Sequence, residues 1–100
     1  MQEWTEQQLK EKQNEHEQLV IFFYTPLCGT CQVSKKMLAV VEQLLPHLNV
    51  GMCNLNYMPN QAEVYEIESV PCLIVLDKNK VQKKLYAFHS VEYLLNELKE

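Results

Sequence analysis

The feature that most constrains this chain is a continuous apolar run at residues 19–24, with the sequence LVIFFY. The run is rich in β-branched and aromatic residues and ends at Thr25 and Pro26. It is typical of a strand covered on both faces, as in parallel sheets flanked by helices. From residue 29 to about 46, apolar residues recur with the spacing of an amphipathic helix. A buried strand followed by such a helix predicts an α/β fold.

The rest of the chain divides into short strands and helices of the same kinds. The pattern predicts strands at residues 48–55, 72–76 and 81–87, and helices at residues 5–16, 61–67 and 90–98. Residues 77–80 form the turn of an antiparallel hairpin. The predicted order is therefore α-β-α-β-α-β-β-α, with a central mixed four-stranded sheet between helices, in a single domain over residues 1–100.

The start of the first helix carries two local signals. Thr5 and Gln8 have the spacing of a capping box, and Trp4 and Leu9 have that of a hydrophobic staple. The apolar face of this helix is weak, so we expect it to pack at the edge of the domain.

Composition excludes several classes of function. The net charge of the 100 residues is −4, and the lysines are interspersed with acids, which argues against nucleic-acid binding. No stretch approaches the ~18 apolar residues of a membrane span. The first 18 residues lack the apolar core of a signal peptide, and together with the initial Met1 this favours a cytoplasmic protein. A secreted domain whose signal had been removed would have a similar sequence.

The residues that carry chemistry are Cys28 and Cys31, placed between the buried strand and the helix. If Cys28 is the N-cap, the free amides of the first turn and the helix dipole favour its thiolate. Cys31 then lies one turn along the same face, and Gly29 leaves the leading sulfur uncovered. Such a pair can attack a target disulfide and resolve the mixed disulfide. A lone CxxC also occurs as half of a zinc site or by chance, but its position after a buried strand favours redox chemistry.

With these residues the sequence resembles the thioredoxin family over essentially its whole length. Three features carry the resemblance: the strand at 20–24 leading into Cys28-Gly29-Thr30-Cys31, the turn at 69–71 before a buried strand, and the closing hairpin and helix. The resemblance implies a protein-disulfide reductase with nucleophilic Cys28, resolving Cys31 and a cis Val70–Pro71 bond facing them. It implies a redox-active Cys28–Cys31 disulfide with no other bound cofactor.

The resemblance also implies how partners bind. Target peptides would lie across Leu27, Gly29, Thr30, Val70 and Pro71, and the loop at 87–89 would complete the surface. The implied partners are disulfide-containing proteins and an NADPH-dependent thioredoxin reductase, and the implied state is a monomer.

Four positions depart from the family pattern. Leu27 replaces a tryptophan, Thr30 a proline, and Phe22 a buried aspartate, while the lysine partner of that aspartate corresponds to Asn54. These departures suggest a thioredoxin-like protein rather than a main cellular thioredoxin. We hypothesise that the missing acid slows resolution by Cys31, so that Phe22→Asp would speed turnover. A binding or adaptor module with slow or idle cysteines is the alternative function, and an oxidant of an export compartment is a third.

The other singled-out residues favour structural interpretations. Cys53 and Cys72 fall within apolar strands, where free cysteines are usually buried. Cys72 follows Pro71 directly and could instead form an alternative disulfide with the pair. A zinc site using all four cysteines would normally show a second CxxC. Lys35 and Lys36 follow Cys31 and are expected to be solvated, with a modest electrostatic effect on the thiolate.

Overall fold

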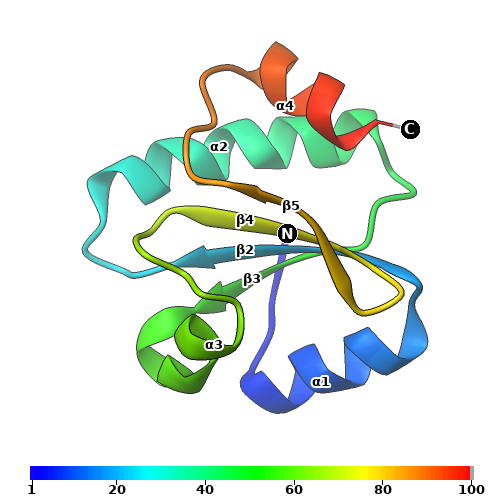
Figure 1. Cartoon of the computed structure of the whole chain (residues 1–100). Helices are drawn as coiled ribbons and strands as arrows, with labels where there is room; N and C mark the ends of the chain where they lie inside the picture. Colours follow the sequence, from blue (N-terminus) through cyan, green and yellow to red (C-terminus); the bar gives the residue numbers. More distant parts are fainter. Residues whose placement is uncertain (100) are drawn as a thin grey trace.

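The computed structural model describes residues 1–99, which form one mixed sheet with two helices on each face (Figure 1). Helices α2 and α4 lie above the sheet in Figure 1, and α1 and α3 lie below it. The elements are β1 (Gln2–Glu3), α1 (Glu6–Glu15), β2 (Gln18–Tyr24), α2 (Gly29–Leu44), β3 (Val50–Asn54), the 3₁₀ turn η1 (Leu55–Tyr57), α3 (Pro59–Val64), β4 (Cys72–Asp77), β5 (Lys80–Leu85) and α4 (Val91–Leu98).

The sheet has the order β1-β3-β2-β4-β5. Strands β1 and β2 both run parallel to β3, β4 is antiparallel to β2, and β5 is antiparallel to β4. The run at residues 19–24 is thus the central strand, and both of its faces are covered, as the sequence predicts. The mixed sheet between helices is confirmed. The expected helix and strand bounds differ from the observed ones by up to three residues.

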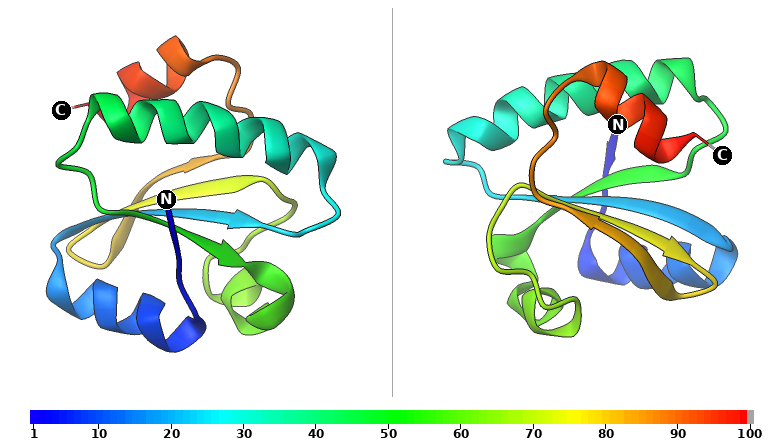
Figure 2. Two further views of the ribbon diagram at one scale, coloured as in Figure 1. Left: turned by 180° about the vertical axis from the view of Figure 1, so that it is seen from behind. Right: turned by 45° about the horizontal axis from the view of Figure 1, so that its top comes forward.

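The expected count of four strands was wrong, because a fifth strand, β1, pairs with β3. Gln2 lies opposite Gly51 and Glu3 opposite Met52, and the Trp4 amide donates to the Met52 carbonyl at 2.9 Å. Figure 2 shows this N-terminal segment leading from the sheet down to α1. Two exposed polar residues are too short a segment to show the alternation that identifies a strand in a sequence.

The start of α1 has the expected capping box. The Thr5 hydroxyl accepts from the Gln8 amide at 3.1 Å, and the Gln8 side chain accepts from the Thr5 amide at 2.9 Å. Trp4 and Leu9 are buried in one cluster on the α1/α3 face of the sheet. The Trp4 ring lies so close to Gly51 that a Cβ there would be 2.2 Å from it. A glycine at this point of β3 therefore lets the ring of Trp4 cover the strand.

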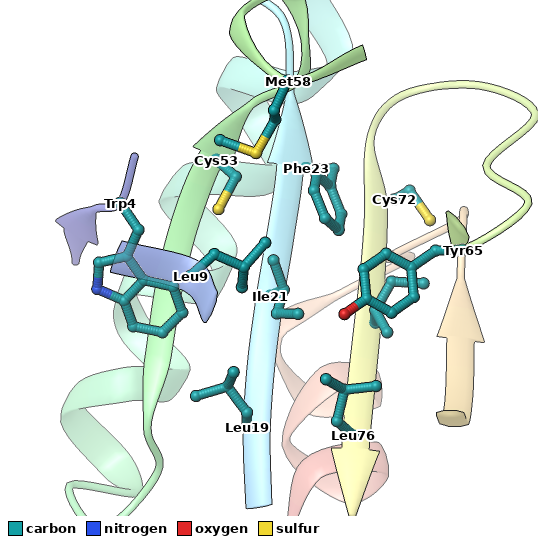
Figure 3. Close-up of a cluster of buried hydrophobic side chains, with 11 residues drawn as sticks. Trp4, Leu9, Leu19, Ile21, Phe23, Cys53, Met58, Tyr65, Cys72 and Leu76 are labelled. Atoms are coloured by element: carbon teal, nitrogen blue, oxygen red, sulfur yellow. The ribbon is translucent and has the colours of Figure 1, made fainter. Parts of the chain in front are cut away.

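The sheet separates two hydrophobic clusters. The α1/α3 face holds Trp4, Ile21, Phe23, Cys53 and Cys72 among others (Figure 3). The α2/α4 face holds Phe22, Cys31, Leu38, Leu73 and Leu94 among others. Alternate residues of β2 enter opposite clusters, because side chains alternate along a strand. No helix within residues 1–99 is both long enough and apolar enough to cross a membrane.

Candidate active site

The site lies where β2 ends and α2 begins. A turn links them, in which the Cys28 amide donates to the Thr25 carbonyl at 3.3 Å. Cys28 is the N-cap of α2 and has an extended backbone, and its Sγ accepts from the Cys31 amide at 3.1 Å. The sulfur therefore receives one of the free N–H groups of the helix end, next to the positive end of the helix dipole. Both interactions favour a thiolate over a thiol.

Cys28 and Cys31 are joined by a disulfide, with their Cα atoms 5.2 Å apart. The two residues differ strongly in access to solvent. Cys28 is half-buried, whereas Cys31 is only 2% exposed and belongs to the α2/α4-face cluster. An external disulfide can therefore reach Cys28 but not Cys31.

The segment before β4 faces this pair, although it is about forty residues away in the chain. The Cys28 Sγ lies 3.9 Å from the carbonyl oxygen of Val70, and the Val70–Pro71 peptide bond is cis. Pro71 is buried and Val70 is half-buried. The structure thus places Val70 beside the CxxC motif.

Three further residues expected at the site surround Cys28 on its solvent side. Leu27 is 98% exposed, and Gly29 and Thr30 are also exposed. No atom lies within 4 Å of the place where a Cβ on Gly29 would be. The Thr30 hydroxyl lies 3.3 Å from the Cys28 Sγ, a contact that proline could not make and that no sequence pattern predicts. The rim of the site is therefore open and apolar at Leu27, and polar at Thr30.

The loop at 87–89 divides between core and surface. Phe88 is buried in the same cluster as Cys31, with its ring 5.8 Å from that of Phe22. Ala87 and His89 are exposed, and the His89 ring packs edge-on against Tyr93. This loop thus supports the site from beneath through Phe88.

Beneath the cysteines the site is aromatic. Phe22 is fully buried and packs against Phe88 and Tyr24, whose ring is stacked 5.9 Å away. The Tyr24 hydroxyl donates to the Glu3 carboxylate. The pKa of Tyr24 is raised, mainly by burial and also by this hydrogen bond. The sequence does not reveal Glu3 as part of the site, because the strand that carries it has no sequence signal of its own. Asn54, which we expect to replace the family's lysine, accepts from the Asn56 amide at 3.0 Å and caps η1.

A cavity of about 280 Å³, which the sequence does not reveal, lies between the end of β2 and the start of α2. Cys31, Phe22, Tyr24 and Lys35 line it. Its walls come from two elements that the sequence does identify, but its existence depends on how they pack.

The other two cysteines lie on the opposite face of the sheet. Cys53 and Cys72 both pair in register with Phe23, whose ring lies between them (Figure 3). Both are free and fully buried, and burial raises the pKa of Cys53 to about 12 and of Cys72 to about 11. The sheet separates Cys72 from the pair, so the alternative disulfide considered for it is wrong. For the same reason the four cysteines do not converge on one metal site.

The arrangement agrees with comparisons to known proteins. The family model described as Thioredoxin matches residues 1–100. The chain belongs to the thioredoxin family. It is 46% identical, over 81% of its length and 76% of the relative's, to the thioredoxin-like protein YusE of Bacillus subtilis. It is 27% identical to a thioredoxin of Chlamydia pneumoniae over 78% of its length and 76% of that protein's.

Solved thioredoxins share the fold at much lower sequence identity. The crystal structure of chloroplastic thioredoxin z superposes with a TM-score of 0.84 at 15% identity, covering 97% of this chain and 89% of that one. A thioredoxin from Halobacterium salinarum gives a TM-score of 0.80 at 17% identity, covering 98% of this chain and 86% of that one. Membership of this redox family agrees with the Cys28–Cys31 disulfide and calls for no other cofactor.

Proposed function

We propose that this thioredoxin-family protein reduces disulfide bonds of other proteins, with Cys28 as nucleophile and Cys31 as resolving thiol. One observation carries the proposal: the accessible Cys28 Sγ accepts a helix-end amide, while Cys31, directly behind it, is buried. This order of access makes Cys28 attack first and Cys31 second.

The reaction proceeds in two exchange steps. The Cys28 thiolate attacks one sulfur of the target disulfide, a bond forms between them, and the other target sulfur leaves as a thiolate. Cys31 then loses its proton and attacks the Cys28 sulfur, and the second target sulfur leaves. The target gains two electrons, and Cys28 and Cys31 become the disulfide. An NADPH-dependent thioredoxin reductase is the proposed electron donor that returns the pair to the dithiol.

Target peptides are proposed to bind over Leu27, Gly29 and Thr30 on one side and Val70 and Pro71 on the other. The exposure of Leu27 and the proximity of the Val70 carbonyl to the Cys28 sulfur support this placement. The site is complete within one chain, which supports action as a monomer. The presence of two free cysteines in addition to the redox pair supports a reducing compartment such as the cytoplasm.

Reduction of insulin, with dithiothreitol as electron source, tests the proposal. Cys28→Ser should reduce turnover to the background rate of dithiothreitol. Cys31→Ser should also stop turnover, but it should accumulate a mixed disulfide with the target, visible by non-reducing electrophoresis. Val33→Ser changes an exposed residue of the same helix and should keep wild-type turnover. Full turnover by Cys28→Ser would overturn the proposal.

An adaptor function is the second candidate. The buried side chains clustered with Phe22 are hydrophobic and supply no acid beneath the pair, which favours it. An adaptor would capture the same target with equal affinity in the wild-type and Cys28→Ser proteins. A redox titration distinguishes a reductant from an oxidant. A reductant should have a reduction potential of about −270 mV, and an export-compartment oxidant one of about −120 mV.

A further inference from the structure

The buried position of Cys31 creates a protonation problem for the second exchange step. Cys31 must lose a proton before it attacks, yet it is 2% exposed and packs in the same cluster as Phe22 and Phe88. Burial among apolar groups disfavours a thiolate. A nearby positive charge would offset this effect.

Lys35, which lines the cavity beneath the start of α2, supplies such a charge. Cys31 and Lys35 both line this cavity, and both belong to α2 with a separation of four residues. Residues at this separation are neighbours on one helix face, about one turn apart. Within residues 1–99, Lys35 forms no ion pair that would neutralise its charge. Lys36 follows it directly but does not line the cavity.

The residues of the other wall carry no charge that would offset the positive charge of Lys35. Tyr24, from β2, donates its hydroxyl to Glu3 of β1, and its raised pKa keeps it neutral at physiological pH. The Glu3 carboxylate is thus engaged by Tyr24, and Glu3 itself does not line the cavity. Thr25, Pro26 and Gln32, which complete the lining, carry no charge.

We infer that Lys35 is a positioning residue for Cys31, and that its positive charge across the shared cavity lowers the pH at which Cys31 becomes the attacking thiolate. The inference rests on the proposed function. The proton of Cys31 passes to water, and the Cys31 sulfur forms the bond to Cys28 as the target sulfur leaves.

A two-phase reaction with Ellman's reagent tests this role. The reduced protein should release one aromatic thiolate when Cys28 attacks the reagent, and a second when Cys31 resolves the mixed disulfide. Stopped-flow measurement across a pH series gives a separate pH midpoint for each phase. The raised pKa values of Cys53 and Cys72 and their burial keep them out of both phases.

Lys35→Met should raise the midpoint of the second phase by about half a pH unit, and slow that phase about threefold below the midpoint. Lys36→Met removes the same charge from the next position and should leave the second phase at the wild-type midpoint. Lys35→Arg should restore it. Added salt should shrink the difference between Lys35→Met and wild type, because the charge is near solvent.

The outcomes separate this inference from the function on which it rests. If the wild-type protein releases only one thiolate per pair, the proposed two-step reduction fails. If it releases two and the second-phase midpoint is the same in Lys35→Met, only the role of Lys35 is overturned. Equal shifts in Lys35→Met and Lys36→Met would also overturn it, because a general field effect would then explain them.

Discussion

The two faces of the sheet hold the same kind of residue in opposite chemical states. On the α2/α4 side, Cys28 and Cys31 meet at a helix end, where an amide donates to the Cys28 sulfur. On the α1/α3 side, Cys53 and Cys72 lie on either side of the Phe23 ring, fully buried and free. Strand β2 contributes to both faces, through Phe22 on one and Phe23 on the other.

This contrast teaches that backbone placement, more than residue type, determines cysteine chemistry here. Burial without a donor raises a thiol pKa, and a helix N-terminus lowers it. The α1/α3 face therefore acts as a structural core, while the α2/α4 face combines core packing with a reactive edge. Substitutions on the α1/α3 face should therefore change the free energy of unfolding, and substitutions on the α2/α4 face should also change the rates of thiol exchange.

The largest expected effect comes from placing an acid on the α2/α4 face. Phe22→Asp removes a fully buried ring and buries a carboxyl group between Tyr24 and Phe88. We expect a loss of at least about 4 kcal/mol in the free energy of unfolding, measured by urea denaturation. Molecules that stay folded should still resolve the mixed disulfide faster near neutral pH, since the carboxylate can take the Cys31 proton.

Phe22→Leu is the matched control for this change. It keeps the position apolar and should cost about 1 kcal/mol, with no increase in the resolution rate. A Phe22→Asp protein that unfolds at the wild-type urea concentration would contradict the packing described for this face. An unchanged resolution rate in its folded fraction would discard the role of the missing acid.

On the α1/α3 face, Gly51→Ala tests the contact that joins β1 to the sheet. A Cβ at this position would lie 2.2 Å from the Trp4 ring, so the ring must move. We expect a loss of about 3 kcal/mol in the free energy of unfolding, with unchanged rates of both thiolate-release phases in the folded protein. The same substitution in a Trp4→Leu background should cost clearly less, because the clashing ring is absent. Equal costs in both backgrounds would show that Trp4 is not the obstacle.

Much of this architecture was predictable from local patterns. The run at 19–24 predicts a central strand, because a short continuous apolar segment in an α/β domain is typical of a strand buried on both faces. The capping box at Thr5 and Gln8 is equally local and forms as expected. The N-cap position of Cys28 follows from a strand, a short turn and a helix in sequence.

What could not be predicted depends on contacts between distant segments. β1 is a strand only because β3 offers it an edge, so Gln2 and Glu3 carry no signal of their own. The cavity shared by Cys31 and Lys35 depends on how α2 packs against β2. The separation of Cys72 from the redox pair depends on which face of β4 it occupies, which adjacency to Pro71 does not reveal.

The smallest effect, and a direct test of the contrast between the two cysteine pairs, is the response of stability to alkaline pH. The pKa values of Cys53 and Cys72 are raised from 9.0 to about 12 and about 11 in the folded protein. Between these values and the unfolded value, the folded state binds more protons than the unfolded state. Its stability must therefore fall as pH rises above about 9.

We expect a loss of roughly 2.5 kcal/mol between pH 8 and pH 10, measured by urea denaturation of the oxidised protein. In that form Cys28 and Cys31 are bonded and do not titrate. Cys53→Ala should be less stable at pH 8 because of the cavity it leaves, yet lose less further stability on going to pH 10. Parallel pH curves for the two proteins would mean that Cys53 titrates alike in the folded and unfolded chain, and the electrostatic contrast between the two faces would fail.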